Sequence, residues 1–133
     1  MDDKALVELA KKARANAYAP YSGFSVGAAV LAADGRVFSG CNIENASYGL
    51  TNCAERTAIF SAVAAGAREL AALAVVADGE LPCSPCGACR QVIAEFAVER
   101  IILANLAGKS RVVTKEDLLP FAFSFEEKSL PSD

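Results

Sequence analysis

Two continuous apolar runs, LAALAVVAD at 70–78 and RIILANL at 100–106, limit the possible folds of this chain more than any other feature. Neither run alternates apolar with polar residues, which is typical of strands that are covered on both faces. Between them, Ser84 and Pro85 are good N-cap and first-turn residues for a helix that we expect to run to about Ala97. Strands that alternate with helices predict a sheet covered by helices in one α/β domain.

The rest of the chain extends this pattern on both sides. An apolar period of three to four residues predicts a first helix, and Asp34-Gly35 is a strong hairpin signal between two strands. The polar residues 42–52 are expected to be irregular, and the polar tail at 126–133 to be loose. The further expected elements are a helix at 3–18, strands on either side of the turn within 24–41, a helix from Cys53 to Ala65 with Gly66 near its cap, a strand at 111–114, and a short helix opened by a capping box at Thr114–Asp117 and ended by Pro120.

Charge and hydropathy exclude several classes of partner. The net charge is −3, the pI is about 5.0, and there is no basic cluster, so binding to nucleic acid is not expected. The apolar runs are too short to cross a membrane, and the first twenty residues contain Lys and Arg throughout, unlike a signal peptide. We therefore expect a soluble cytoplasmic protein of one domain, residues 1–133.

The chain contains five cysteines and no histidine. An odd cysteine count in a chain that does not look secreted argues against a disulfide framework and favours metal or thiol chemistry. If Ser84 caps its helix, Cys86 and Cys89 lie three residues apart on one helix face, where one metal ion can reach both. Cys53, at the start of the preceding helix, could supply a third thiolate, because helix N-termini favour negative charge.

A metal held by three sulfurs keeps one coordination position open, which is the catalytic arrangement of zinc. A zinc-bound water ionises near neutral pH, and Glu55, two residues after Cys53, could carry its proton.

Other interpretations of these residues stay open at this point. C-x-x-C spacing also occurs in redox pairs and in structural zinc sites, and Cys83 could complete a four-cysteine site. Glu55 could belong to a capping box that begins at Asn52. Arg56 and Arg90 would ordinarily be surface charges on their helices.

Together, however, C-A-E at 53–55 and P-C-x-x-C at 85–89 match the nucleobase deaminase signature in its three-cysteine form. The chain resembles the cytidine deaminases, specifically the small homotetrameric kind with three cysteine ligands. The stretches that carry this resemblance are AYAPYSGFSVGAAV (17–30), GCNIENASYG (40–49), NCAERTA (52–58), SPCGACRQV (84–92) and LLPFAFS (118–124).

The resemblance implies a fold, a reaction and a set of site residues. It implies a mixed sheet between helices in three layers, one Zn²⁺ per subunit, and hydrolysis of cytidine or deoxycytidine to uridine or deoxyuridine and ammonia, as in pyrimidine salvage. A deaminase of another cytosine nucleoside, such as an antibiotic, is the alternative. The implied roles are zinc ligation by Cys53, Cys86 and Cys89, proton transfer by Glu55, ribose binding by Asn42 and Glu44, base contacts from Phe24 and from the backbone at Ala54 and Ser84, and packing on the substrate by Phe123 of a neighbouring subunit. Cys41 and Cys83 are expected to be bystanders.

Three thiolates leave a zinc site with a net negative charge, which should weaken the metal as a Lewis acid. Donors to the sulfurs would offset that charge. We expect Arg56 to supply most of this effect, helped by Gln91 and by the two helix N-termini.

Overall fold

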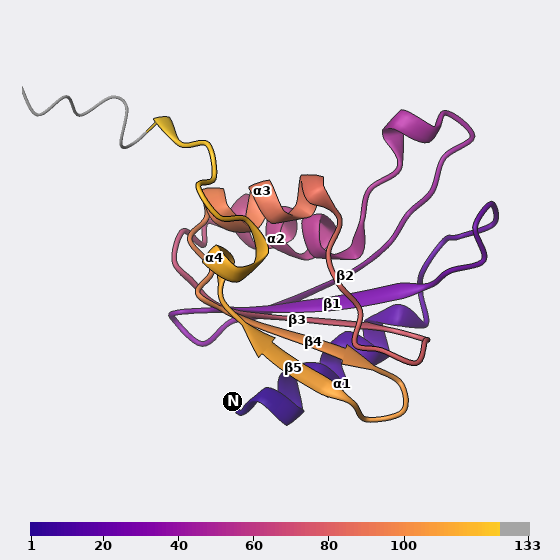
Figure 1. Cartoon of the computed structure of the whole chain (residues 1–133), viewed down its shortest axis with the longest axis horizontal. Helices are drawn as coiled ribbons and strands as arrows, with labels where there is room; N and C mark the ends of the chain where they lie inside the picture. Colours follow the sequence, from indigo (N-terminus) through magenta and orange to yellow (C-terminus); the bar gives the residue numbers. More distant parts are fainter. Residues whose placement is uncertain (126–133) are drawn as a thin grey trace, which may run out of the picture.

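The computed structural model describes residues 1–125, which form a five-stranded sheet with helices on both faces (Figure 1). The elements in chain order are α1 (Asp3–Arg14), β1 (Val26–Ala32), β2 (Val37–Cys41), the 3₁₀ helix η1 (Tyr48–Leu50), α2 (Ala54–Ala64), β3 (Leu70–Ala77), α3 (Gly87–Glu95), β4 (Arg100–Asn105), β5 (Ser110–Val113) and α4 (Lys115–Leu118).

The sheet has the strand order β2-β1-β3-β4-β5 and mixed direction. β3 and β4 are parallel, whereas β1 pairs antiparallel with both β2 and β3, and β5 pairs antiparallel with β4. The two apolar runs of the sequence are thus the adjacent strands β3 and β4. Their connection contains α3, as expected for a parallel pair.

The sheet lies between two helical layers. α1 covers one face, and α2 and α3 cover the other (Figure 1). Because side chains alternate along a strand, Leu73 and Val75 of β3 enter the larger core beneath α2 and α3. Ala74 and Val76 enter the smaller core beneath α1. This arrangement confirms the expected α/β fold with a mixed sheet sandwiched by helices.

Two glycines allow the helices to lie directly against the sheet. A Cβ atom at Gly40 of β2 would lie 2.5 Å from the backbone nitrogen of Ala58 in α2. A Cβ atom at Gly27 of β1 would lie 2.0 Å from the carbonyl oxygen of Ala10 in α1. Since real Cβ contacts are not this short, these two positions require glycine, and Gly40 sets the distance of α2 from the sheet.

Two helix boundaries differ from the sequence expectation. α1 ends at Arg14 rather than at residue 18, because the chain turns so that the Tyr18 amide donates to the carbonyl of Asn42 at 2.9 Å. α3 begins at Gly87 rather than at Pro85. The Asp34-Gly35 hairpin and the capping box at Thr114 are confirmed.

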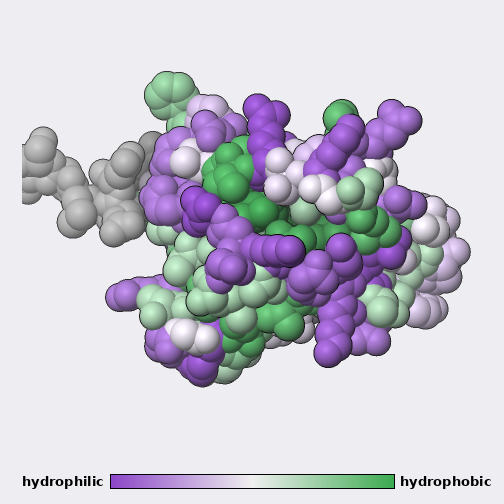
Figure 2. Space-filling model, turned by 90° about the horizontal axis from the view of Figure 1, so that it is seen from below, coloured by the Kyte–Doolittle hydropathy of each residue, from purple (hydrophilic) through white to green (hydrophobic). Residues whose placement is uncertain are grey.

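The expectation of a loose tail at 126–133 lies outside the described residues. Within the described part, no helix is long and apolar enough to span a membrane. On the α1 side, the surface carries mostly hydrophilic side chains, with smaller hydrophobic areas between them (Figure 2).

Candidate metal centre

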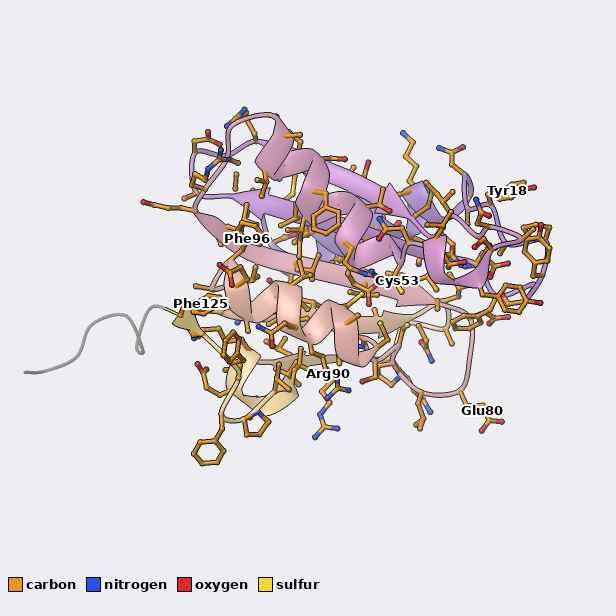
Figure 3. The ribbon with its side chains drawn as sticks, turned by 90° about the horizontal axis from the view of Figure 1, so that it is seen from above. Tyr18, Cys53, Glu80, Arg90, Phe96 and Phe125 are labelled. Carbon is orange, nitrogen blue, oxygen red and sulfur yellow. The ribbon has the colours of Figure 1, made fainter. Side chains whose placement is uncertain are left out.

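The three cysteines expected to act as ligands lie at the N-termini of α2 and α3. Cys53 is the N-cap residue of α2 and Cys86 is the N-cap residue of α3, and neither thiol bonds to an amide of its own helix. Cys89 is the third residue of α3. In Figure 3, Cys53 lies between the two helices. The sulfurs therefore lie in the positive field of two helix N-termini, which favours thiolates.

The spacing of the sulfurs fits a tetrahedral metal. All three lie within 4.8 Å of one another, and the Sγ atoms of Cys53 and Cys86 are 3.6 Å apart. Zinc–sulfur bonds of 2.3 Å at tetrahedral angles give a sulfur–sulfur distance of about 3.8 Å. Cys89 is buried, Cys53 is half-buried and Cys86 is exposed, so the cluster is open on one side.

The other two cysteines do not join this cluster among residues 1–125. Cys41 is half-buried on β2, and Cys83 packs against the larger core while its amide donates to the Ala104 carbonyl. Burial raises the pKa of Cys83 to about 11. The described residues thus offer three sulfurs, the number that leaves zinc one open position.

Glu55 is a buried carboxyl beside the sulfurs. It is 4% exposed and lies in the first turn of α2. Burial, with the negative charge of Cys53 as a smaller cause, raises the pKa of Glu55 to about 7. A carboxyl with a pKa near neutrality can both accept and donate a proton at physiological pH.

Arg56 lies against the sulfur cluster. Its Nη2 donates to Cys53 Sγ at 3.4 Å, and its buried Nε is without a hydrogen-bond partner among the described residues. The pKa of Cys53 falls to about 5 because the neighbouring Cys89 thiol and Arg56 donate to its sulfur. The pKa of Cys89 is raised, since it shares its proton with Cys53 and is buried.

The structure overturns two sequence interpretations of the helix starts. The Asn52 side chain donates to Thr57 Oγ1 at 3.0 Å, and Glu55 is the second residue of α2, so the two do not form a capping box. Ser84 does not cap α3, because its hydroxyl accepts from Arg90 Nη2 at 2.8 Å while the chain stays extended as far as Cys86.

Gln91 contacts the C-terminal segment instead of a sulfur. Its Nε2 donates to the Phe123 carbonyl at 3.0 Å. Residues two positions apart on a helix do not face each other, so Gln91 is directed away from the side of Cys89. The expected donation from Gln91 to the sulfurs therefore stays a prediction.

The residues expected at the sugar and the base lie on two adjoining loops. Asn42, 8% exposed, accepts from the Val26 amide at 2.9 Å and donates to the Phe24 carbonyl at 2.7 Å. Glu44 accepts from the amides of Tyr21 and Ser22 at 2.9 and 3.1 Å. These bonds join the loop after α1 to the loop after β2, and the Phe24 side chain remains 48% exposed.

Ala54 and Phe123 have very different surroundings. Ala54 is fully buried in the first turn of α2, between Cys53 and Glu55. Phe123 is 55% exposed and stacks edge-on against Phe125, with ring centroids 5.0 Å apart. It lines a hollow of about 440 Å³ with Ala94 and other residues at the C-terminal end of α3. That end of α3 is about 8 Å along the helix from Cys89.

Two structural side chains escaped the sequence analysis. Arg90, expected to be a surface charge, donates to the carbonyls of Pro85 at 2.9 Å and Leu118 at 2.7 Å as well as to Ser84. Asn105, 1% exposed, fixes the loop after β3. Its side chain donates to the carbonyls of Gly79 and Glu80 and accepts from the Lys109 amide. Both anchor the irregular segment before Cys86, and no sequence signal marked either residue.

Comparison with known proteins identifies the family of this chain. Residues 1–105 match the family described as the cytidine and deoxycytidylate deaminase zinc-binding region. A cytidine deaminase from Sporosarcina psychrophila is 56% identical over 135 residues, which cover 100% of this chain and 99% of that protein. One from Halalkalibacterium halodurans is 55% identical, with coverage of 96% and 98%.

The fold gives the same assignment. A crystal structure of cytidine deaminase from Burkholderia pseudomallei superimposes with a TM-score of 0.90 and is 57% identical. The match covers 92% of this chain and 100% of that one. With its three-cysteine cluster, its mixed sheet and this similarity along its length, the chain belongs to the zinc-binding cytidine and deoxycytidylate deaminase family.

Proposed function

We propose that this chain catalyses the zinc-dependent hydrolysis of cytidine and deoxycytidine to uridine and deoxyuridine, with release of ammonia, in pyrimidine salvage. The observation that carries the proposal is the buried Glu55 carboxyl beside three clustered sulfurs. Cys53, Cys86 and Cys89 would hold the zinc ion. Bound zinc lowers the pKa of a water molecule, so that this water is a nucleophile at neutral pH.

Glu55 carries the protons of the reaction. Its carboxylate accepts one proton of the attacking water and passes it to the ring nitrogen. It then accepts the second proton, from the newly added hydroxyl, and passes it to the departing amine. The carbon–nitrogen bond breaks, and the water oxygen becomes the new carbonyl oxygen of the base. A pKa of about 7 suits a group that must act as base and then as acid.

Arg56 offsets the charge that three thiolates place on the metal. Its guanidinium already donates to Cys53, so it withdraws negative charge from the ligand set. The N-termini of α2 and α3 act in the same direction. This compensation makes an all-sulfur site electrophilic enough for hydrolysis without a histidine ligand.

The nucleoside binds where the loop after α1 meets the loop after β2. The Glu44 carboxylate accepts hydrogen bonds from the ribose hydroxyls, and the Asn42 side-chain amide donates to them. Phe24 lies beside the pyrimidine. The backbone at Ala54 and Ser84 contacts the edge of the base. The existing bonds of Asn42 and Glu44 support this proposal, because they hold both side chains in place before substrate arrives.

We infer that the active enzyme is a cytoplasmic homotetramer with its sites near subunit interfaces. The support is the number of large apolar side chains left exposed on one subunit. Tyr48 and Leu50 are 75% and 71% exposed, and Phe121 and Phe125 are also exposed at the other end of the chain. Phe123, at the far end of α3 from its own cysteines, packs on the substrate of a neighbouring subunit.

The test is an ultraviolet assay of the purified protein with cytidine, with and without a chelator. We expect conversion to uridine, loss of activity on removal of the metal, and recovery when zinc is added back. Glu55→Gln keeps the shape of the side chain but cannot carry a proton, so it should bind one zinc per subunit and lose at least a thousandfold in kcat.

Cys83→Ser is the matched control, because Cys83 is a nearby thiol outside the cluster. It should keep both zinc and activity. Zinc loss in this variant, or absorption of a cobalt-substituted sample typical of four thiolates, would favour a closed structural site and contradict the proposal. Activity on another cytosine nucleoside but not on cytidine would restrict the substrate to the alternative class.

A further inference from the structure

The Glu44 carboxylate is held by a turn of the neighbouring loop, at Tyr21 and Ser22. Its Oε1 accepts the amides of Tyr21 and Ser22, and its Oε2 accepts the Ser22 hydroxyl at 2.5 Å. The Ser22 hydroxyl bond is the main cause that lowers the pKa of Glu44, so the group stays an anion. Among residues 1–125, Tyr21 and Ser22 thus provide the three donors to this carboxylate.

Ser22 also holds the backbone of Phe24. Its Oγ accepts from the Phe24 amide at 3.0 Å, while Asn42 binds the Phe24 carbonyl from the other side. Gly23 makes this turn possible with a φ of +69°, a conformation that side chains rarely adopt. One hydroxyl therefore connects the backbone of Phe24 with the carboxylate of Glu44.

A serine that bonds the amide two residues ahead is a common turn motif, and that bond alone would be only structural. The additional bond to Glu44 goes further, because it joins two segments 22 residues apart in the sequence. Neither Ser22 nor Glu44 lies in a helix or strand. Backbone bonds between Tyr18 and residues 42 and 44 also join these loops, and the bond from Ser22 to Glu44 adds a side-chain link at the turn itself.

We propose that Ser22 is a positioning residue for nucleoside binding, which sets the Glu44 carboxylate and Phe24 in register for the sugar and the base. This inference rests on the proposed function. Oε2 of Glu44 accepts one bond from the protein and Oε1 accepts two, so Oε2 has the free acceptor site for a ribose hydroxyl. The Ser22 hydroxyl fixes the direction in which that site points.

The test compares Ser22→Ala with Ser22→Thr in steady-state assays of the zinc-loaded enzyme. We expect Ser22→Ala to raise the KM for cytidine about tenfold, the effect of losing one hydrogen bond to a charged group. The kcat should change less than threefold, because the bond orients substrate in the ground state and the transition state alike. Ser22→Thr keeps a hydroxyl and should restore most of the affinity.

A second substrate separates positioning of Glu44 from a general loosening of the turn. For 2′,3′-dideoxycytidine, which has no ribose hydroxyls for Glu44 to bind, Ser22→Ala should raise KM by less than half the factor seen for cytidine. The Kd for uridine, measured by calorimetry, should rise together with the KM for cytidine.

Ser61→Ala is the control, since the Ser61 hydroxyl also makes a local exposed bond, to the Thr57 carbonyl at 2.8 Å. It should leave KM unchanged. If Ser22→Ala lowers only thermal stability or kcat, or raises KM equally for both nucleosides, the inference is overturned while the proposed function stands. A wild-type protein that binds zinc but converts no cytidine would overturn both.

Discussion

Gly40→Ala should damage the metal site indirectly, by displacing α2, against which Gly40 packs. The added Cβ would lie 2.5 Å from the nitrogen of Ala58 and 2.8 Å from the carbonyl oxygen of Ala54, and both are backbone atoms that cannot rotate away. Ordinary van der Waals contact begins at 3.4 Å. α2 must therefore move away from β2 by roughly 0.9 Å, or the strand must bend by as much.

That displacement carries Cys53 and Glu55 with it, whereas Cys86 and Cys89 stay with α3. Metal–ligand distances tolerate only about 0.2 Å, so a shift of this size weakens zinc binding. We expect a zinc affinity at least tenfold lower, a kcat about a hundredfold lower, and a loss of roughly 1–3 kcal/mol in unfolding free energy. The measurements are zinc per subunit, chelator competition, turnover of cytidine and urea unfolding.

Gly27→Ala is the matched control. Its Cβ would lie 2.0 Å from the carbonyl oxygen of Ala10, so the packing clash is at least as severe, but it displaces α1, which carries no site residue. This variant should lose stability while its folded fraction keeps wild-type zinc affinity. The reasoning is refuted if Gly40→Ala binds zinc and turns over like the wild type, or if Gly27→Ala loses zinc affinity equally.

Two further predictions concern polar side chains that bond to neighbouring segments. Arg56→Gln and Arg56→Ala should lower zinc affinity by roughly ten- to a hundredfold and reduce turnover, because the Cys53 sulfur loses a charged donor; wild-type zinc content together with wild-type turnover in both variants would rule out charge compensation. Asn105→Ala removes three hydrogen bonds of a buried side chain and should cost about 3 kcal/mol of unfolding free energy in urea titrations. A loss below 1 kcal/mol would mean that water replaces those bonds.

Local patterns were enough to predict the strands and several turns. β3 and β4 follow from uninterrupted apolar runs, and the hairpin between β1 and β2 follows from Asp34-Gly35, because side-chain burial and turn chemistry act over a few residues. The capping box at Thr114 is equally local. The start of α2 was predicted to within one residue, whereas α3 begins at Gly87 instead of Pro85.

Ser84 and Asn52 are good N-cap residues, but each is engaged by a residue further along the chain. Arg90 binds the hydroxyl of Ser84, and Thr57 accepts from the amide of Asn52. The cap position is therefore left to a cysteine in both helices, and its sulfur is directed outward instead of bonding to the helix. A propensity scale cannot predict this outcome, because a cysteine is a poor cap by itself.

The sequence by itself determined the chemical inventory: three thiols at C-A-E and P-C-x-x-C, one glutamate beside them, and an alternation of strands and helices that places both motifs at helix starts. Only the tertiary structure decided which groups meet. It excluded Cys41 and Cys83 from the cluster among the described residues, turned Gln91 toward Phe123, and tied Ser22 to Glu44. The physical reason is that spacing fixes contacts within a helix turn or a hairpin, whereas contacts between distant segments depend on how closely the layers pack.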